Sequence, residues 1–406
     1  MRYKGIPIDI LMFPSMLLLG FVTMSIMMLS TAAFNAPGQP PTTQPTTTQA
    51  TTNPKDRHWT MTPFWTSTTM QGESLLFIAP SADQPARAEL LFRPEKILSV
   101  KSATGQVTYE EGRDYILTPD QPLLTLPKGS RIPFKTEQEL FVPKGAANSY
   151  GDAKDHPGQG MLFSEGQFFH KLQVEVSYTH GGKGWAGPKP AFAGEQLPRT
   201  LAKLRAREPL TLAILGDSIS VGGNASGYIG APPSMPPYGK LVVQGLRDRY
   251  GSAITLKNFS VGGKAAFWGI EQSAKLAAEK PDLVFLAFGM NDGTGGVKAA
   301  EYAANIQRQI RIIRQANPQA EFILVGTMLA NPEWAGAGAQ FHADYRDALA
   351  KLSGPGVVFA DVTAMWTELL KHKRFVSLTG NGINHPNDFG HRVYAQTILS
   401  LLTPTK

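Results

Sequence analysis

The chain has 406 residues, 42% of them hydrophobic, and a formal net charge of +7. This length favours two folded units with ordinary cores. The Lys and Arg residues do not gather into runs interleaved with aromatic residues, which argues against a nucleic-acid-binding protein. Because the chain has no cysteine, disulfide bonds and a lipidated cysteine are excluded, and we expect the cores alone to stabilise the fold.

The amino-terminal segment has the pattern of an export signal. Arg2 and Lys4 precede an uncharged apolar stretch over residues 10–34, which closes on the small residues "STAA". Such a stretch can also span a bilayer, so residues 1–34 fit either a cleaved signal peptide or a membrane anchor. Either one predicts an exported protein that is periplasmic, secreted or membrane-anchored. Residues 35–57 follow as a Pro/Thr-rich linker that cannot bury apolar area.

Residues 58–190 show the alternation of apolar and polar residues that is typical of strands. In "LQVEVSY", every second residue from Leu172 to Tyr178 shares one face. Turn sequences separate shorter strand candidates, which are Ser74–Ala79, Ala88–Phe92, Lys96–Val100, Tyr115–Leu117 and Leu123–Leu126. Short strands at this spacing predict a β-sandwich, jelly-roll-like domain. The polar run over Lys144–Gln167 is predicted to be a long loop.

After a linker near Gly187–Arg199, apolar strands alternate with helical patterns. The strand candidates are Leu212–Leu215, Ile254–Phe259, Leu283–Phe288, Phe322–Gly326 and Val357–Ala360. All but the second are continuous apolar runs, as expected of parallel strands covered on both faces. Apolar residues from Tyr302 to Ile313 recur at helical spacing and stop at Asn317-Pro318. This order predicts a three-layer, doubly wound α/β domain over residues 200–406.

Four loops of this α/β domain hold residues suited to acyl transfer. Functional groups of a doubly wound sheet collect beyond the carboxyl ends of its strands. These places hold Ser218 in "GDSIS", Gly263 in "NFSVGG", Asn291 in "GMND" and His385 in "NHPND". A serine can attack, an imidazole can take its proton, and N–H donors can hold the oxyanion. Each residue alone also fits a helix cap, a tight turn or a surface loop, but the four together favour a catalytic site.

The four motifs, in this order, resemble those of the SGNH hydrolases, the GDSL-type esterases, over residues 205–404. The resemblance implies that Ser218 is the nucleophile and His385 the general base. The oxyanion hole that it implies consists of the backbone N–H groups of Ser218 and Gly263, with Gly262 as the neighbouring alternative, and the side-chain amide of Asn291. Two acidic residues beside the motifs, Asp217 and Asp292, are expected to brace loops.

The sequence departs from the family at the acid. The family's Asp usually lies three residues before the histidine, where this chain has Gly382. The candidates for an acid or orienting group are Asn381, Asn384, Asp361 and Asp388, and a Ser–His dyad is the remaining alternative. A literal Asp-x-x-His ends at His391, but its Asp suits the start of the last helix. His385 is preferred because it precedes proline, as the family's catalytic histidine does.

These features predict an exported serine esterase that removes O-acetyl groups from a polysaccharide or other glycan through an acyl-enzyme. A β-sandwich ahead of such a domain resembles the layout of bacterial carbohydrate esterases. The alternatives are a lipase or lysophospholipase, and a glycan-binding protein whose hydrolase domain has lost its acid. For Phe267, Trp268 and Trp334, which lie in loops near the site, ordinary packing is preferred to lining a pocket. No metal or phosphate-binding motif is present, so we expect no cofactor or metal and, as partner, an acetylated glycan or small ester.

Overall fold

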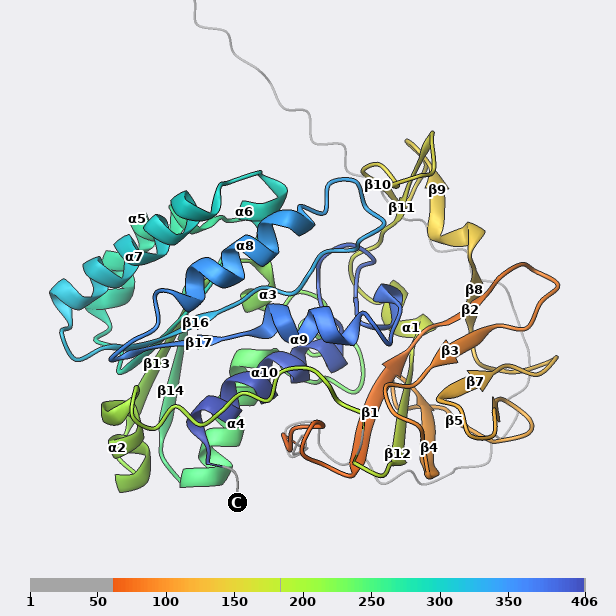
Figure 1. The fold of residues 1–406 in the computed structure, drawn as a ribbon, viewed down its shortest axis with the longest axis horizontal. Coiled ribbons are helices and arrows are strands. Elements are labelled where there is room, and N and C mark those ends of the chain that lie inside the picture. The colour runs from red at the N-terminus through yellow and green to blue at the C-terminus, as the bar shows by residue number, and fades with distance from the viewer. Residues whose placement is uncertain (1–60, 183, 405–406) are drawn as a thin grey trace, which may run out of the picture. The chain divides into compact units, whose positions relative to one another are not determined.

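A parallel sheet of five strands lies in the carboxyl-terminal part of the residues that the computed structural model describes, which are 61–182 and 184–404 (Figure 1). Across the sheet, the order is β14 (Ile254–Asn258), β13 (Leu210–Gly216), β15 (Leu283–Ala287), β16 (Glu321–Val325) and β17 (Val357–Ala360). β15 and β16 are buried throughout, because they lie inside the sheet with helices on both faces. β14 is an edge strand with exposed residues, which explains why its sequence is not a continuous apolar run.

Helices cover both faces of this sheet (Figure 1). One face packs against α5 (Ala266–Ala278), α7 (Ala299–Ala316) and α8 (Ala339–Ala350). The other face packs against α2 (Pro198–Ala206), α4 (Tyr238–Tyr250), α9 (Val362–Leu369) and α10 (Asp388–Leu402). The predicted helical stripe from Tyr302 to Ile313 is the buried side of α7, which ends before Asn317. The doubly wound α/β prediction is therefore confirmed.

The preceding region, residues 61–182, is predicted from the sequence to be a β-sandwich, jelly-roll-like domain, and the structure confirms that it is rich in strands. Its antiparallel sheet has the order β1 (Thr69–Leu75), β12 (Val174–Thr179), β4 (Lys96–Ser102) and β5 (Thr108–Tyr109). A mixed sheet has the order β6 (Ile116–Leu117), β7 (Leu123–Thr125), β3 (Arg87–Glu89), β2 (Phe77–Ala79) and β8 (Phe134–Thr136). A small antiparallel sheet consists of β10 (Ser149–Tyr150), β11 (Gln159–Leu162) and β9 (Phe141–Pro143), and two short helices, η2 (Gln138–Leu140) and α1 (Phe168–Leu172), complete the region.

Three details of this region differ from the sequence prediction. The single strand predicted over Ser74–Ala79 is two strands, because the backbone N–H of Leu76 donates to Ser377 Oγ at 3.0 Å, and the chain then enters a different sheet. Leu172 ends α1 instead of joining β12. The predicted long loop over Lys144–Gln167 contains β10 and β11, which pair through backbone contacts that its polar sequence does not signal.

Buried polar contacts join β1 to the carboxyl-terminal helices. The Arg392 guanidinium donates to the carbonyls of Gln71 and Gly72. Glu73 forms an ion pair with Lys373, and both side chains are fully buried. One apolar core also runs through both regions. The division into domains at residues 58–190 and 200–406 stays a prediction, and the predicted leader (1–34) and linker (35–57) lie outside the described residues. Among the described helices, none combines the length and the apolar character needed to cross a bilayer.

Candidate active site

Ser218 begins α3 (Ser218–Val221), directly beyond the carboxyl end of β13. Asp217 caps this helix, since its carboxylate accepts a hydrogen bond from the Ile219 N–H at 3.0 Å. The strand order reverses between β13 and β15, which is where doubly wound sheets bind their ligands. Burial raises the pKa of Asp217 to about 7. Through its hydrogen bond to the Ile219 N–H, this carboxyl group shapes the turn that presents the serine.

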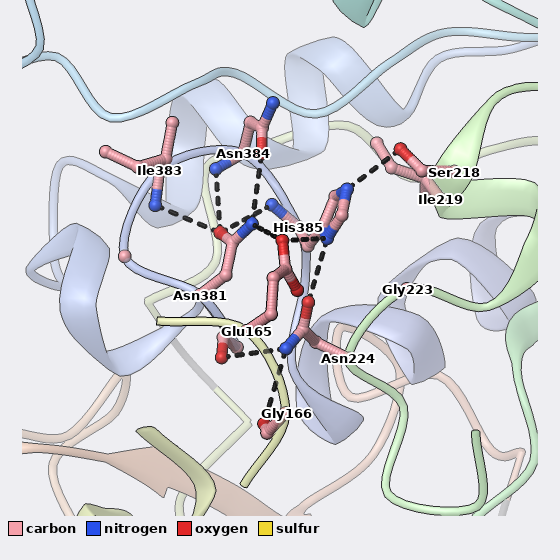
Figure 2. Close-up of polar contacts among 12 residues, drawn as sticks. Glu165, Gly166, Ser218, Ile219, Gly223, Asn224, Asn381, Ile383, Asn384 and His385 are labelled. Carbon is pink, nitrogen blue, oxygen red and sulfur yellow. Dashed lines mark hydrogen bonds and ion pairs between the residues drawn. The ribbon is translucent and has the colours of Figure 1, made fainter. Parts of the chain in front are cut away.

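His385 lies in the loop before α10, and its Nε2 is 2.8 Å from Ser218 Oγ (Figure 2). The loop folds around the buried side chain of Asn381. Its Oδ1 accepts hydrogen bonds from the backbone N–H groups of Ile383, Asn384 and His385 at 3.0 to 3.1 Å. Asn384 Oδ1 in turn accepts a bond from Asn381 Nδ2 at 3.1 Å. Both asparagines therefore shape the loop, and these contacts assign neither of the two candidates to the imidazole.

Two side chains that the sequence analysis missed face the other ring nitrogen of His385 (Figure 2). Asn224 Oδ1 lies 2.8 Å from Nδ1, and Asn224 Nδ2 donates to the Gly380 carbonyl at 3.0 Å. Glu165 Oε1, between β11 and α1, lies 3.4 Å from Nδ1. No local pattern marks either residue, and only the missing carboxylate before His385 indicates that a partner has to come from elsewhere.

The ionisation of Glu165 depends on opposing effects. Partial burial raises the pKa of its carboxyl group. The hydrogen bonds and charge of His385, together with the amide of Asn381, lower the pKa by more, so that it ends below its usual value. Glu165 is therefore an anion at neutral pH.

The two aspartates predicted as alternative acids have other partners. Asp361 caps α9 by accepting from the Ala364 N–H at 2.9 Å, and its other oxygen pairs with Arg346 at 2.7 Å. Asp388 lies in the first turn of α10, where Oδ1 accepts from the Ser226 N–H at 2.7 Å. The structure therefore gives both candidate aspartates partners at loops and helix starts, away from the imidazole.

His391 is fully buried and does not reach the serine. Its Nε2 lies 3.0 Å from the Gly223 carbonyl oxygen. Burial lowers the pKa of His391 to about 4, so that the ring is neutral at pH 7 and can donate to this carbonyl. A Cβ on Gly223 would lie 2.9 Å from His385 Nδ1, so a glycine here leaves room for the imidazole. His391 thus supports the turn beside His385.

The predicted oxyanion donors lie in loops that contact each other. A Cβ on Gly262 would lie 3.7 Å from Ser218 Cβ, whereas one on Gly263 would have no atom within 4 Å. Asn291, in α6 (Met290–Thr294), donates from Nδ2 to the Lys264 carbonyl at 3.0 Å. The choice of Gly263 over Gly262 as the backbone donor stays a prediction. Because an amide nitrogen carries two hydrogens, Asn291 can hold Lys264 with one and offer the other to a ligand.

Asp292 braces the loop that follows Lys264. Its two carboxylate oxygens lie 3.0 and 3.1 Å from the Ala266 N–H at the start of α5. Burial raises the pKa of Asp292 to about 6. Over residues 61–182 and 184–404, no group of three or more His, Cys, Asp or Glu side chains is placed to hold a metal ion.

The three aromatic residues near the site differ in exposure. Trp268 packs against the core, and Trp334 is 8% exposed. Phe267, at the start of α5, is 61% exposed. Packing therefore accounts for the two tryptophans, and Phe267 remains free to contact a ligand.

The carboxyl-terminal part of the chain matches the model of a known family. Residues 214–393 match the model of the GDSL-like lipase/acylhydrolase family. The search of curated proteins found no match.

Several solved structures are similar to part of the chain. A two-domain esterase active on acetylated mannans is 22% identical, with a TM-score of 0.42 over 53% of this chain and 55% of the other. An acetylxylan esterase from Geobacillus stearothermophilus is 20% identical, with a TM-score of 0.40 over 48% of this chain and 95% of the other. An enzyme from the metagenome of Lake Arreo, Spain, is 22% identical, with a TM-score of 0.40 over 48% and 94%. The match thus spans about half of the two-domain esterase, and likeness this distant does not indicate a substrate.

Proposed function

We propose that this chain, whose residues 214–393 form a GDSL-like lipase/acylhydrolase domain, is an exported serine esterase that removes O-acetyl groups from a glycan. The observation that carries the proposal is the 2.8 Å contact between Ser218 Oγ and His385 Nε2, at the carboxyl edge of the sheet. A serine hydroxyl is a weak nucleophile until a positioned base takes its proton. This contact supplies the base.

In the proposed reaction, Ser218 Oγ attacks the acyl carbonyl carbon while His385 Nε2 takes the hydroxyl proton. The N–H groups of Ser218 and Gly263 and the amide of Asn291 hold the oxyanion. The imidazolium then returns its proton to the departing sugar oxygen, which leaves an acetylated serine. A water molecule gives a proton to Nε2 and attacks this ester. Collapse of the second oxyanion breaks the bond to Ser218 Oγ, which takes the proton back from Nε2, and acetic acid leaves.

Exposed aromatic side chains on the segments that follow β13 and β14 support a glycan as the substrate. Phe267 is 61% exposed and Tyr228 is 56% exposed. The ring of Tyr228 comes within 3.5 Å of a Cβ placed on Gly222, whose N–H donates to the Ser218 carbonyl. Exposed aromatic rings beside a site mark a binding surface. The four motif loops themselves contain no long apolar run that would suit a long acyl chain. Export is supported by the apolar stretch over residues 10–34.

The decisive experiment is hydrolysis of p-nitrophenyl acetate by the wild-type protein and three variants. Ser218→Ala and His385→Ala are each expected to lower kcat by about 10³-fold or more, since neither retains the nucleophile–base pair. His391→Ala is expected to lose thermal stability and to keep a kcat well above that of His385→Ala. A wild-type protein no faster than Ser218→Ala would contradict the esterase and favour a glycan-binding role.

The substrate class is tested by measuring hydrolysis rates of esters with different acyl lengths and the release of acetate from acetylated glycans. We expect rates that fall from acetyl to longer acyl esters, and acetate release from an acetylated xylan or mannan that Ser218→Ala does not produce. Rates that rise with acyl length, with no acetate released from any acetylated glycan, would favour a lipase or lysophospholipase instead.

A further inference from the structure

We propose that Glu165 is the positioning carboxylate of His385: the β-rich region brings its charge to Nδ1, where it stabilises the imidazolium that forms as Ser218 attacks. The inference rests on the proposed esterase function and deepens it. It means that the site of the α/β region is completed by a side chain from another part of the chain.

The position that holds the family's acid has no room for a side chain in this structure. Gly382, three residues before the histidine, has a φ of +89°, which a residue with a side chain rarely adopts. A Cβ at this position would lie 2.3 Å from the Leu162 carbonyl oxygen and 2.7 Å from the Phe169 ring. An aspartate therefore does not fit at position 382. The segment that fills its place is the one that carries Glu165.

Contacts on both sides of Glu165 hold it against the histidine loop. Before it, the Ser164 N–H donates to the Asn381 carbonyl at 3.2 Å. Asn381 Nδ2 donates to Glu165 Oε1 at 3.0 Å. After it, the Gly166 carbonyl accepts from Asn224 Nδ2 at 3.4 Å. The Glu165 side chain is 53% exposed, but an ordinary surface glutamate has no such partners, and fixing one costs conformational entropy. The carboxylate is thus pre-positioned for a specific contact.

Asn224 and Glu165 together supply the two effects of a single aspartate, which are orientation of the ring and a negative charge. Because Asn224 Nδ2 donates to the Gly380 carbonyl, its Oδ1 must face the ring, where it accepts from Nδ1–H at 2.8 Å. This selects the tautomer in which Nε2 is free to take the serine proton. A neutral amide orients the ring but contributes no charge. The ionised carboxylate of Glu165 lies 3.4 Å from the same nitrogen. This distance is too long for a strong hydrogen bond but short enough for a strong Coulombic effect.

The test compares the full-length wild-type protein with Glu165→Gln, which keeps the shape and removes the charge. Glu165→Gln is expected to lower kcat for p-nitrophenyl acetate by about 10- to 100-fold, with KM changed by less than about threefold, since one nearby charge alters proton affinity by about 1–2 pK units. Asp152→Asn, which removes an exposed charge from the same polar run, Lys144–Gln167, is the matched control and should stay within about twofold of wild type.

Two further readouts separate positioning from a structural role. A carboxylate favours the imidazolium, so the acidic limb of the kcat/KM profile should move to lower pH in Glu165→Gln. The other titratable groups facing the ring, Asp217 and His391, are the same in both proteins. The double variant Glu165→Gln/Asn224→Asp restores a carboxylate 2.8 Å from Nδ1 and should recover at least about tenfold over Glu165→Gln.

The outcomes distinguish this inference from the proposed function. A wild-type protein no faster than Ser218→Ala would overturn both. An active wild type with a Glu165→Gln variant of unchanged kcat and unchanged acidic limb would overturn the role of Glu165 alone. A loss of activity in Glu165→Gln with no shift of the limb and no recovery in the double variant would also overturn it, because the residue would then act only on structure.

Discussion

The amide of Asn291 links two loops at the site. Its Nδ2 donates to the Lys264 carbonyl at 3.0 Å, two residues after Gly262, the glycine that approaches Ser218. One hydrogen of the amide thus fixes the geometry of the neighbouring loop, and the other is available to the developing oxyanion. A donor fixed before the reaction needs no reorganisation as the charge forms, which makes it effective.

Replacing this amide should affect the rate more than substrate binding. Asn291→Ala is expected to lower kcat for p-nitrophenyl acetate by about 10²–10³-fold with little change in KM, because the oxyanion exists only in the transition state. The measurement is steady-state kinetics, with Asn317→Ala as the control. Asn317 lies before β16, and its Nδ2 also donates to a backbone carbonyl, that of Pro281, at 2.7 Å. The control should keep its kcat within about twofold. Equal kcat in the two variants would remove Asn291 from the oxyanion hole.

At the scale of elements, a buried carboxyl group connects α6 to the start of α5. Both oxygens of Asp292 approach the Ala266 N–H, and burial raises the pKa of this group from 3.8 to about 6. Its protonated form is therefore favoured in the folded protein. The stability that this contributes is fully present below pH 4 and is lost as the pH rises through 6, since the folded state then binds more protons than the unfolded chain.

The direction of this pH dependence can be tested by replacing Asp292 with a residue that does not ionise. In Asp292→Asn, the amide oxygen can still accept from Ala266, but the group no longer ionises. Relative to this variant, the wild-type protein should lose about 2 to 3 kcal/mol of unfolding free energy between pH 4 and pH 7. Urea titrations of both proteins across this range measure the difference. A difference that is constant with pH, or that grows in favour of wild type, would contradict the raised pKa.

At the scale of the whole molecule, a buried ion pair connects the β-rich region to the segment after α9. Glu73 on β1 pairs with Lys373 and also accepts from Tyr178 Oη at 2.5 Å and the Leu91 N–H at 2.8 Å. Burial lowers the pKa of Lys373, and the charge of Glu73 opposes this. A buried pair contributes little compared with an apolar pair of the same shape, but losing one partner leaves a buried charge uncompensated.

Because losing one partner costs more than replacing both, we expect a definite order of stability among the variants of this pair. Lys373→Met should lower the unfolding free energy by about 3 to 5 kcal/mol, because the Glu73 carboxylate then loses its buried ion-pair partner. The double variant Glu73→Gln/Lys373→Met should be more stable than this single variant, since both charges are gone. Urea unfolding followed by tryptophan fluorescence measures the order. A Lys373→Met variant as stable as wild type would show that this pair does not hold the two regions together.

The amino-acid sequence alone predicts the fold class and the pairing of Ser218 with His385. Apolar runs alternating with helical stripes predict a doubly wound sheet, because only strands covered on both faces are apolar throughout. Once the sheet is known, the residues that follow its strands must converge at one edge. The structure brings two of these residues, Ser218 and His385, to 2.8 Å of each other. Local patterns suffice for this part because each residue is placed by its own strand or helix.

The residues on the Nδ1 side of the imidazole could be found only from the three-dimensional packing. Glu165 belongs to a polar run that reads as a loop, and its position beside His385 depends on the packing of the segment from Leu162 to Phe169 against Gly382. Asn224 reaches the same nitrogen from the turn after α3. Both contacts join residues far apart in the sequence. Such contacts have no period or local motif, because they arise from how two regions pack and not from the propensity of either one.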